Sequence, residues 1–317
     1  MNDSLIGINL PLISVTIKVK VTRAIKWNSF PGSVIHGIIG YKLKDYSCVM
    51  AHRNCNKCFL VHSCAYGMIY ESPVPPDSKR MKLYPQSPHP IRVAVYPWDK
   101  PELKEGTVIE IGLTLFGKTA ANLLMVLLSL ESGFEAGIGR KYQGERGKAE
   151  IISLSDNLSK SEKPWSDLKK NYVGFAHPVV INNDRTEISK IALHFKSPLK
   201  ITTAGKSNYK PDFRDIIATL LRRASNLSYF FHDRELDLDY KGILQKAELL
   251  ETVKDYSRVK AIRYSSRQSK TISISGVTGN LTINDCPPDL LYLLEVGQYT
   301  GLGKSTTMGL GDYELKL

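Results

Sequence analysis

The sequence predicts an α+β protein made of two similar halves, and three observations support that expectation. Apolar and polar residues alternate cleanly along residues 12–22, which is typical of a half-buried strand. A similar succession of strand and helix patterns runs through residues 1–155 and again through residues 181–317. Each succession ends in a helix, a glycine-rich loop and a strand, which indicates an internal duplication. The polar stretch 156–180 is expected to be a linker.

The first half follows the order strand, helix, strand, strand, helix, strand, which is that of the ferredoxin-like βαββαβ unit. A cysteine-bearing insertion, about residues 47–90, interrupts it after the first helix. Ser33 is expected to cap that first helix. The expected strands cover residues 12–22, 91–95, 108–116 and 151–154, and the helices run from Ser33 to Tyr46 and over 118–131.

The second half repeats this plan. One strand pattern is expected to turn back on itself at Gly279-Asn280. The chain should therefore hold two tandem ferredoxin-like domains, 1–155 and 181–317. The expected strands cover residues 191–195, 261–264, 271–283 and 312–317, and the helices cover 213–226, 240–253 and 288–295.

The net charge of the chain indicates which kinds of binding partner to expect. The 317 residues include 43 Lys and Arg against 31 Asp and Glu, a formal net charge of +12. That balance favours a polyanionic partner, nucleic acid before a membrane surface, although an evenly spread surplus for solubility is the alternative. The N-terminus lacks the features of a signal peptide, and the longest apolar run, Leu123–Leu128, is too short to cross a bilayer. We therefore expect a cytoplasmic protein with no membrane partner.

The C-terminal residues form a glycine-rich motif around a lysine. Backbone N–H groups exposed in such a loop, with Lys304 beside them, suit a phosphate. A nucleotide-binding P-loop is excluded, because Gln298 stands where its first glycine must fall and only twelve residues follow Ser305. The motif glycines are Gly301, Gly303, Gly309 and Gly311.

Four of the five cysteines fall within seventeen residues of the insertion. An intracellular chain rarely uses that density for disulfides, whereas four thiolates complete a tetrahedral zinc site. We expect structural zinc, with an iron–sulfur cluster or reduced, unligated thiols as the alternatives. The expected ligands are Cys48, Cys55, Cys58 and Cys64.

Several stretches of the chain, taken in order, resemble those of a known family: Cys64-Ala65-Tyr66-Gly67 with Glu71 and Pro73, Leu113–Gly117, Gly137-Ile138-Gly139-Arg140, Arg263–Gln268 and Gly276–Gly279. The motif Gly301-x-Gly303-x5-Gly309-x-Gly311 resembles the C-terminal glycine-rich loop of the RAMP superfamily of CRISPR-associated proteins. Within that superfamily the chain resembles the sixth Cas family, the endoribonucleases that process precursor crRNA.

The resemblance implies that the two domains bind a CRISPR repeat RNA in precursor crRNA and cleave it without a metal. The 2′-hydroxyl attacks the adjacent phosphorus, leaving a 2′,3′-cyclic phosphate and a 5′-hydroxyl. Histidine suits the proton transfers and a cation suits the dianionic phosphorane. The alternative is a non-cleaving RNA-binding RAMP subunit of an effector complex, and other Cas effector subunits are candidate partners in both cases.

His36 is the leading catalytic candidate, because the family often places its histidine in the first helix. Gly40 and Lys44 follow on the same helical face, which would leave His36 open to RNA. A histidine held by the helix flank for structural reasons is the alternative. Lys44 and Tyr41 are assisting candidates. The expected RNA contacts outside the glycine motif are Arg140, Lys141, Arg146, Lys148, Arg263 and Arg267, with Lys304 inside it.

Overall fold

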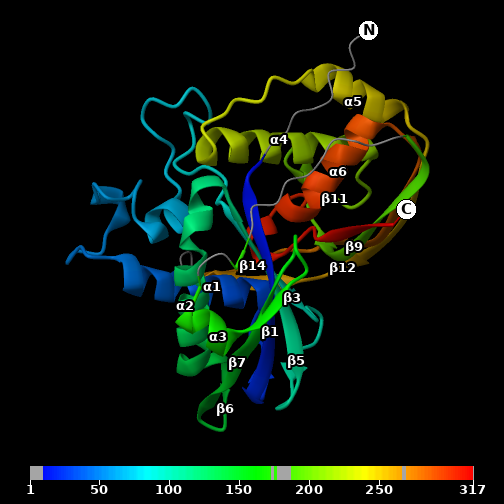
Figure 1. Cartoon of the computed structure of the whole chain (residues 1–317). Coiled ribbons are helices and arrows are strands. Elements are labelled where there is room, and N and C mark those ends of the chain that lie inside the picture. The colour runs from blue at the N-terminus through cyan, green and yellow to red at the C-terminus, as the bar shows by residue number, and fades with distance from the viewer. Residues whose placement is uncertain (1–9, 173–174, 177–186, 266–268, 317) are drawn as a thin grey trace. The chain divides into compact units, whose positions relative to one another are not determined.

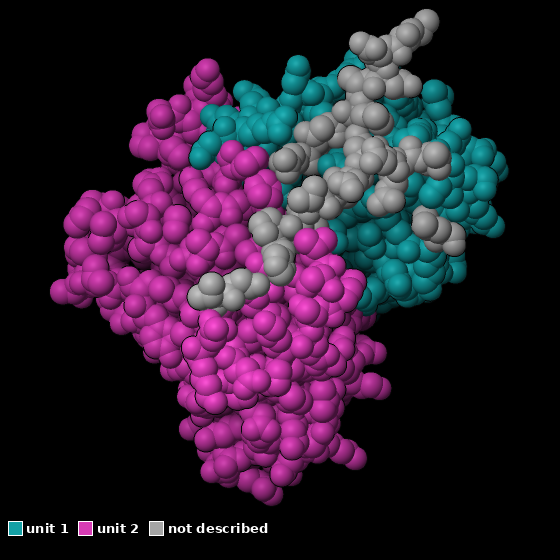
Figure 2. Space-filling view, viewed as in Figure 1, with its two compact units in different colours: residues 1–10, 180–229, 233–317 teal, residues 11–179, 230–232 magenta. Residues whose placement is uncertain are grey.

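A computed structural model describes residues 10–172, 175–176, 187–265 and 269–316. The chain divides into two compact units, coloured separately in Figure 2. We call residues 11–179 with 230–232 the N-terminal unit, and residues 1–10, 180–229 and 233–317 the C-terminal unit. Each unit is described by itself.

The N-terminal unit is built on an antiparallel sheet in the order β3-β5-β1-β7-β6, with β8 paired to β7. Strand β1 is central because its alternate residues Val15, Ile17 and Val19 are fully buried. The strands are β1 (Leu12–Arg23), β3 (Ile91–Tyr96), β5 (Val108–Phe116), β6 (Ile138–Tyr142), β7 (Glu145–Asp156) and β8 (Glu162–Pro164), and a small separate sheet joins β2 (Ile25–Lys26) to β4 (Glu102–Leu103).

Two helices of this unit pack on the sheet and on each other, α1 beside β3 and α2 beside β7 (Figure 1). Helix α1 buries Ile35, Ile39 and Leu43, which recur every four residues and so share one face. It begins at Pro31, a residue suited to the first helical position, so the expected cap at Ser33 was wrong. The helices are α1 (Pro31–Ser47), α2 (Leu123–Ala136) after a 3₁₀ turn at Gly117–Asn122, and α3 (Trp165–Lys170).

Two expectations for this half need correction. Helix α2 runs past residue 131, where it was expected to give way to a glycine-rich loop, and includes Gly133; the basic residues after it belong to the hairpin of β6 and β7. The stretch expected to be a linker contains β8 and α3, whose Trp165 and Leu168 join the hydrophobic core. These two apolar residues stand alone among polar neighbours, so the composition of the stretch concealed their burial.

The C-terminal unit has an antiparallel sheet in the order β12-β15-β9-β16 and two small hairpins, β10–β11 and β13–β14. Its strands are β9 (Ile188–Leu199), β10 (Ile201–Thr203), β11 (Lys206–Asn208), β12 (Thr252–Val259), β13 (Ile262–Ser265), β14 (Lys270–Ser273), β15 (Gly276–Cys286) and β16 (Tyr313–Lys316). Its helices are α4 (Phe213–Phe231), α5 (Tyr240–Leu249) and α6 (Pro288–Thr300).

The two main sheets have the same topology. Among the four strands of each βαββαβ unit, the spatial order is β7-β1-β5-β3 in one and β16-β9-β15-β12 in the other. Both run fourth, first, third, second in chain order, with a helix after the first strand and another before the fourth. The α+β fold of two tandem ferredoxin-like domains and the internal repeat of elements are therefore confirmed.

The second half also departs from expectation at two places. Strand β15 continues through Gly279, which sits at a bulge with φ +111° instead of forming a turn. Strand β12 begins at Thr252, where a helix was expected to continue. No helix in the described part of the chain combines the length and the apolar character needed to cross a membrane.

Candidate functional site

His36 lies at one end of a row of four side chains, His36, Tyr70, Tyr66 and Lys44, which we call the aromatic ladder. Helix α1 contributes His36 and Lys44, and the tyrosines come from a π-helical turn, η2 (Gly67–Glu71), and the residue before it. The His36 and Tyr70 ring centroids are 4.7 Å apart, and Tyr70 stacks on Tyr66 at 5.6 Å with the ring planes 1° apart. The Lys44 Nζ lies 5.0 Å from the Tyr66 ring centroid. The ladder thus joins α1 to the cysteine-bearing insertion.

Gly40 makes this contact possible. A Cβ atom at Gly40 would lie 2.5 Å from a carbon of the Tyr70 ring, so a larger residue would push that ring away. The Tyr70 hydroxyl donates a 2.8 Å hydrogen bond to the backbone carbonyl of His36. The prediction that His36, Gly40 and Lys44 share one helical face is confirmed. The prediction that this face is open was wrong, because the tyrosine rings cover it.

The three catalytic candidates are not gathered at one point. His36 and Lys44 lie at opposite ends of the aromatic ladder, with two rings between them. Tyr41 is 69% exposed and, five residues after His36, points about 140° away around the helix axis. Burial holds the pKa of Tyr70 well above its usual range, so this phenol stays protonated near neutral pH. His36 is the member of the row whose ordinary pKa suits proton transfer.

The hairpin of β6 and β7 presents a basic surface on the N-terminal unit. Gly139 and Gly147 let it lie against residues 24–26, since a Cβ atom at either glycine would lie under 3 Å from that backbone. Lys26 extends over the Tyr142 ring, with its Nζ 3.3 Å from the centroid. Four side chains of the hairpin that the sequence assigned to RNA are exposed here: Arg140, Lys141, Arg146 and Lys148.

A second group of cations lies in the C-terminal unit, where Arg263 of β13 and Lys304 of the glycine motif act on Lys200. Burial lowers the pKa of Lys200, and the charges of Lys304 and Arg263 lower it further. Burial also lowers the pKa of Arg263, whose Nε is shielded from solvent and has no hydrogen-bond partner among the described residues. Sequence reasoning missed Lys200, because only the fold brings it to the other two. Arg267 lies outside the described residues.

The glycine motif itself is largely buried. Gly301, Gly309 and Gly311 are buried, and Gly303 is half-buried. The Lys304 N–H donates to the Lys200 carbonyl, and the Gly311 N–H donates to the Pro198 carbonyl. The expectation that the motif exposes its backbone N–H groups to a phosphate was therefore wrong at these two positions. The glycines let the loop pack closely on the end of β9. The Lys304 side chain nevertheless stays exposed.

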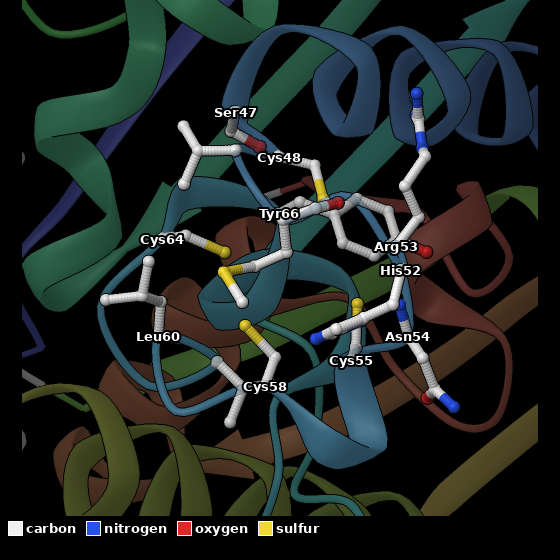
Figure 3. Close-up of a pocket in the computed structure, with 13 residues that line it drawn as sticks. Ser47, Cys48, His52, Arg53, Asn54, Cys55, Cys58, Leu60, Cys64 and Tyr66 are labelled. Atoms are coloured by element: carbon white, nitrogen blue, oxygen red, sulfur yellow. Dashed lines mark hydrogen bonds between the residues drawn. The ribbon is translucent and has the colours of Figure 1, made fainter.

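The four clustered cysteines line one pocket beside the aromatic ladder, together with His52 and Tyr66 (Figure 3). All four thiols are half-buried and free of disulfides. As they stand, no three Cys, His, Asp or Glu side chains in the described ranges are grouped closely enough to hold a metal ion. Burial raises the pKa of Cys55, nearby Lys44 lowers it, and the charges of Glu71, Cys64 and Cys48 raise it again.

Comparison with known proteins agrees with this architecture. The family model for the N-terminal domain named AF_1859_N matches residues 10–187, more than half of the chain. The model for the CRISPR-associated endoribonuclease Cas6 matches residues 193–313. No curated protein sequence is similar enough to match the chain.

Solved structures of low sequence identity share the fold. The structure described as a Cas6 (TTHB231) product complex is 14% identical, with a TM-score of 0.57 over 96% of this chain and 99% of that one. Cas6 (TTHB231) of Thermus thermophilus in a second structure is also 14% identical, with a TM-score of 0.54 over 97% and 99%. A partial Cas6-RT-Cas1–Cas2 complex is 12% identical, with a TM-score of 0.58 over 98% of this chain and 47% of that one.

The two tandem ferredoxin-like domains and the family matches define a CRISPR-associated protein. The chain belongs to the Cas6 family of CRISPR-associated endoribonucleases, a family of RNA-cleaving enzymes.

Proposed function

We propose that this protein binds CRISPR repeat RNA and cleaves precursor crRNA without a metal, by attack of a 2′-hydroxyl on the adjacent phosphorus. The products are a 2′,3′-cyclic phosphate and a 5′-hydroxyl. The observation that carries the proposal is the placement of His36 on α1, fixed by Tyr70, in a chain of the Cas6 family. Solved proteins of the same fold include one described as a product complex.

In this proposal His36 moves the proton. An imidazole can take a proton from the 2′-hydroxyl or give one to the leaving oxygen near neutral pH, which typically accelerates cleavage about 10²–10⁴-fold. The Tyr70 ring packs against the imidazole and the His36 Nε2 is shielded from solvent, so RNA reaches this nitrogen only when the side chains that cover it move. Lys44 is a weaker candidate for the charge at the phosphorane, because its ammonium group lies over Tyr66.

Phosphate binding is assigned to the two basic surfaces. The exposed hairpin cations Arg140, Lys141, Arg146 and Lys148 serve the N-terminal unit. Arg263, Lys200 and Lys304 serve the C-terminal unit, where mutual repulsion makes a phosphate group a favourable counter-ion. Arg267 remains a proposed contact from its sequence alone.

A second candidate function is RNA binding without cleavage, as a RAMP subunit of an effector complex. It is favoured by the cover of the tyrosine rings over α1 and by the separation of His36 from Lys44. Other Cas proteins are proposed partners in either function, since a solved protein of this fold is described within a Cas6-RT-Cas1–Cas2 complex.

One experiment separates the two functions. The full chain is incubated with its host's repeat RNA in EDTA, single-turnover cleavage is followed, and the ends of the products are mapped. We expect a cyclic phosphate, a 5′-hydroxyl, no cleavage of RNA with a 2′-deoxy nucleotide at the scissile position, and slowing of about 10²–10⁴-fold in His36→Ala. His62→Ala, an exposed histidine of the insertion, is the control and should keep the native rate.

Each other outcome is decisive as well. Tight binding by the native protein with no cleavage supports the non-cleaving subunit. An undiminished rate in His36→Ala places the chemistry elsewhere in the chain. Cleavage that requires added Mg²⁺ contradicts the metal-independent mechanism.

A further inference from the structure

We propose that Cys48, Cys55, Cys58 and Cys64 bind one structural zinc ion, and that this ion holds the tyrosines of the aromatic ladder against α1. The proposal concerns a site separate from the cleavage chemistry. It rests on the convergence of the four cysteines on one pocket, on the polar groups around that pocket, and on the weak core of the segment that carries them.

Three short segments bring the thiols together. Cys48 caps the C-terminal end of α1, and Cys55 and Cys58 begin and cap a 3₁₀ turn, η1 (Cys55–Lys57). Cys64 precedes η2, and its backbone carbonyl accepts a hydrogen bond from the Met68 N–H. Figure 3 shows the four sulfur atoms around the same space. Cysteines far enough apart to belong to separate turns therefore face one another across one pocket, as a four-thiolate zinc site requires.

The pocket suits a single ion. Its free volume is about 20 Å³, enough for a guest the size of a water molecule. Zinc needs four sulfur atoms at about 2.3 Å from the metal, and the thiols must rotate and move inward to meet that distance. The surroundings permit such a movement, because none of the residues of η1 is buried and all four thiols are half-buried.

One backbone N–H group at the pocket is placed to orient a thiolate ligand. The Gly67 N–H donates a 3.2 Å hydrogen bond to the Cys64 sulfur, the kind of outer contact that orients a metal ligand. Gly67 is required there, because a Cβ atom would lie 2.1 Å from the Val61 carbonyl oxygen. Four thiolates and one Zn²⁺ leave a net charge of −2. Lys44 lies over Tyr66, which lines the pocket, so its ammonium group is placed to offset part of that charge, whereas Arg53 at the pocket is already paired with Asp45.

The stretch from Cys48 to Cys64, which carries the four cysteines, also needs a cross-link. Val49 and Phe59, two of its large apolar side chains, are each 79% exposed, so little hydrophobic burial holds it in place. A metal ion can replace a core that a short insertion is unable to build. Tyr66 lines the pocket and stacks on Tyr70, which contacts His36. Zinc would therefore fix the tyrosine that covers the proposed catalytic histidine.

The test starts from the native full chain. Elemental analysis should find about one zinc ion per chain, and the Cys55→Ser and Cys58→Ser variants should lose it. The matched control is Cys286→Ala, which removes a cysteine buried in the C-terminal unit and should keep the zinc. Iron with sulfide, disulfides among the four cysteines, or zinc retained in both serine variants would each overturn the proposal.

A second measurement avoids variants that fail to fold. Zinc is removed from the native protein with a chelator, and zinc alone is then restored. Proteolysis within residues 48–70 should increase on removal and return to the native pattern on restoration. Cobalt(II) added to the stripped protein should give the visible absorption of tetrahedral thiolate coordination. A proteolysis pattern that is unchanged by zinc removal, together with no cobalt absorption, means that the four thiols hold no metal.

Discussion

The Tyr70 side chain is bound to His36 twice, by a hydrogen bond from its hydroxyl to the His36 carbonyl, 2.8 Å long, and by ring contact at 4.7 Å. The backbone and the imidazole of the proposed catalytic residue are thus fixed by one side chain from the insertion. Changes at Tyr70 should therefore alter both the stability of the N-terminal unit and the access of RNA to His36.

The first prediction separates the contribution of the hydrogen bond from that of the ring contact. Tyr70→Phe keeps the ring and loses the hydrogen bond, which should lower the free energy of unfolding by about 0.5–1.5 kcal/mol. Tyr70→Ala also loses the ring contacts and should cost about 3–5 kcal/mol, the range for truncating a well-packed aromatic side chain. Denaturant unfolding measures both values. Equal stabilities of the two variants would contradict the packing role of the ring.

A second prediction uses two glycines of the same helix. Gly40→Ala should displace Tyr70, because the new Cβ atom would lie 2.5 Å from its ring. Gly37→Ala is the control, since no heavy atom lies within 4 Å of that position. Alanine favours helix over glycine by about 1 kcal/mol, so the control should be neutral or stabilising and Gly40→Ala destabilising. Melting temperatures test the difference. A change in melting temperature of the same sign in both variants would contradict the close contact of Gly40 with Tyr70 in the aromatic ladder.

The third prediction concerns the glycine motif. Gly311 has φ +64°, and a Cβ atom there would lie 1.7 Å from the Leu302 carbonyl oxygen. Gly106 has φ +82° and open space around it, so Gly106→Ala reports the backbone strain alone, about 1–2 kcal/mol. Gly311→Ala should cost clearly more, as measured by denaturant unfolding. A cost no greater than that of the control would show that the motif can yield without loss of packing.

RNA affinity should depend on salt through the cations beside the glycine motif. If Lys304 neutralises one phosphate, Lys304→Ala should reduce the slope of log affinity against log salt by about 0.7–0.9. Lys241→Ala, an exposed lysine on α5, makes the same charge change and should leave the slope nearly unaltered. Titrations of repeat RNA at several salt concentrations give both slopes. Equal slopes in the two variants would remove Lys304 from the interface.

Cys286 provides a prediction about pH. Burial raises the pKa of its thiol from 9.0 to about 12, so the thiol stays protonated in the folded protein while the unfolded thiol ionises. The folded state then binds more protons between these values, and this residue makes stability fall as pH rises from about 9 to about 12. At pH 8 an alkylating reagent should modify Cys286 only after denaturation. Mass spectrometry of the alkylated protein would detect any modification of the native form.

Local patterns were sufficient for most elements. The alternation along β1 and the four-residue recurrence in α1 are properties of neighbouring residues, so both were predicted from sequence. The hairpin after α2 was not predicted, because Gly133 suggested that the helix gives way to a loop. Gly133 instead lies in α2, where the Ile38 side chain occupies the space that a Cβ atom at Gly133 would fill.

The sequence by itself determined most of the strand and helix order, the repeat, the family and the cluster of four cysteines, since each is a pattern along the chain. Only the tertiary structure decided what covers each residue. It placed Tyr70 over His36, bonded Lys304 to the Lys200 backbone, and brought the charge of Arg263 near Lys200. It also turned the glycine motif inward onto β9. These contacts join residues distant in sequence, and their geometry depends on packing that no local pattern contains.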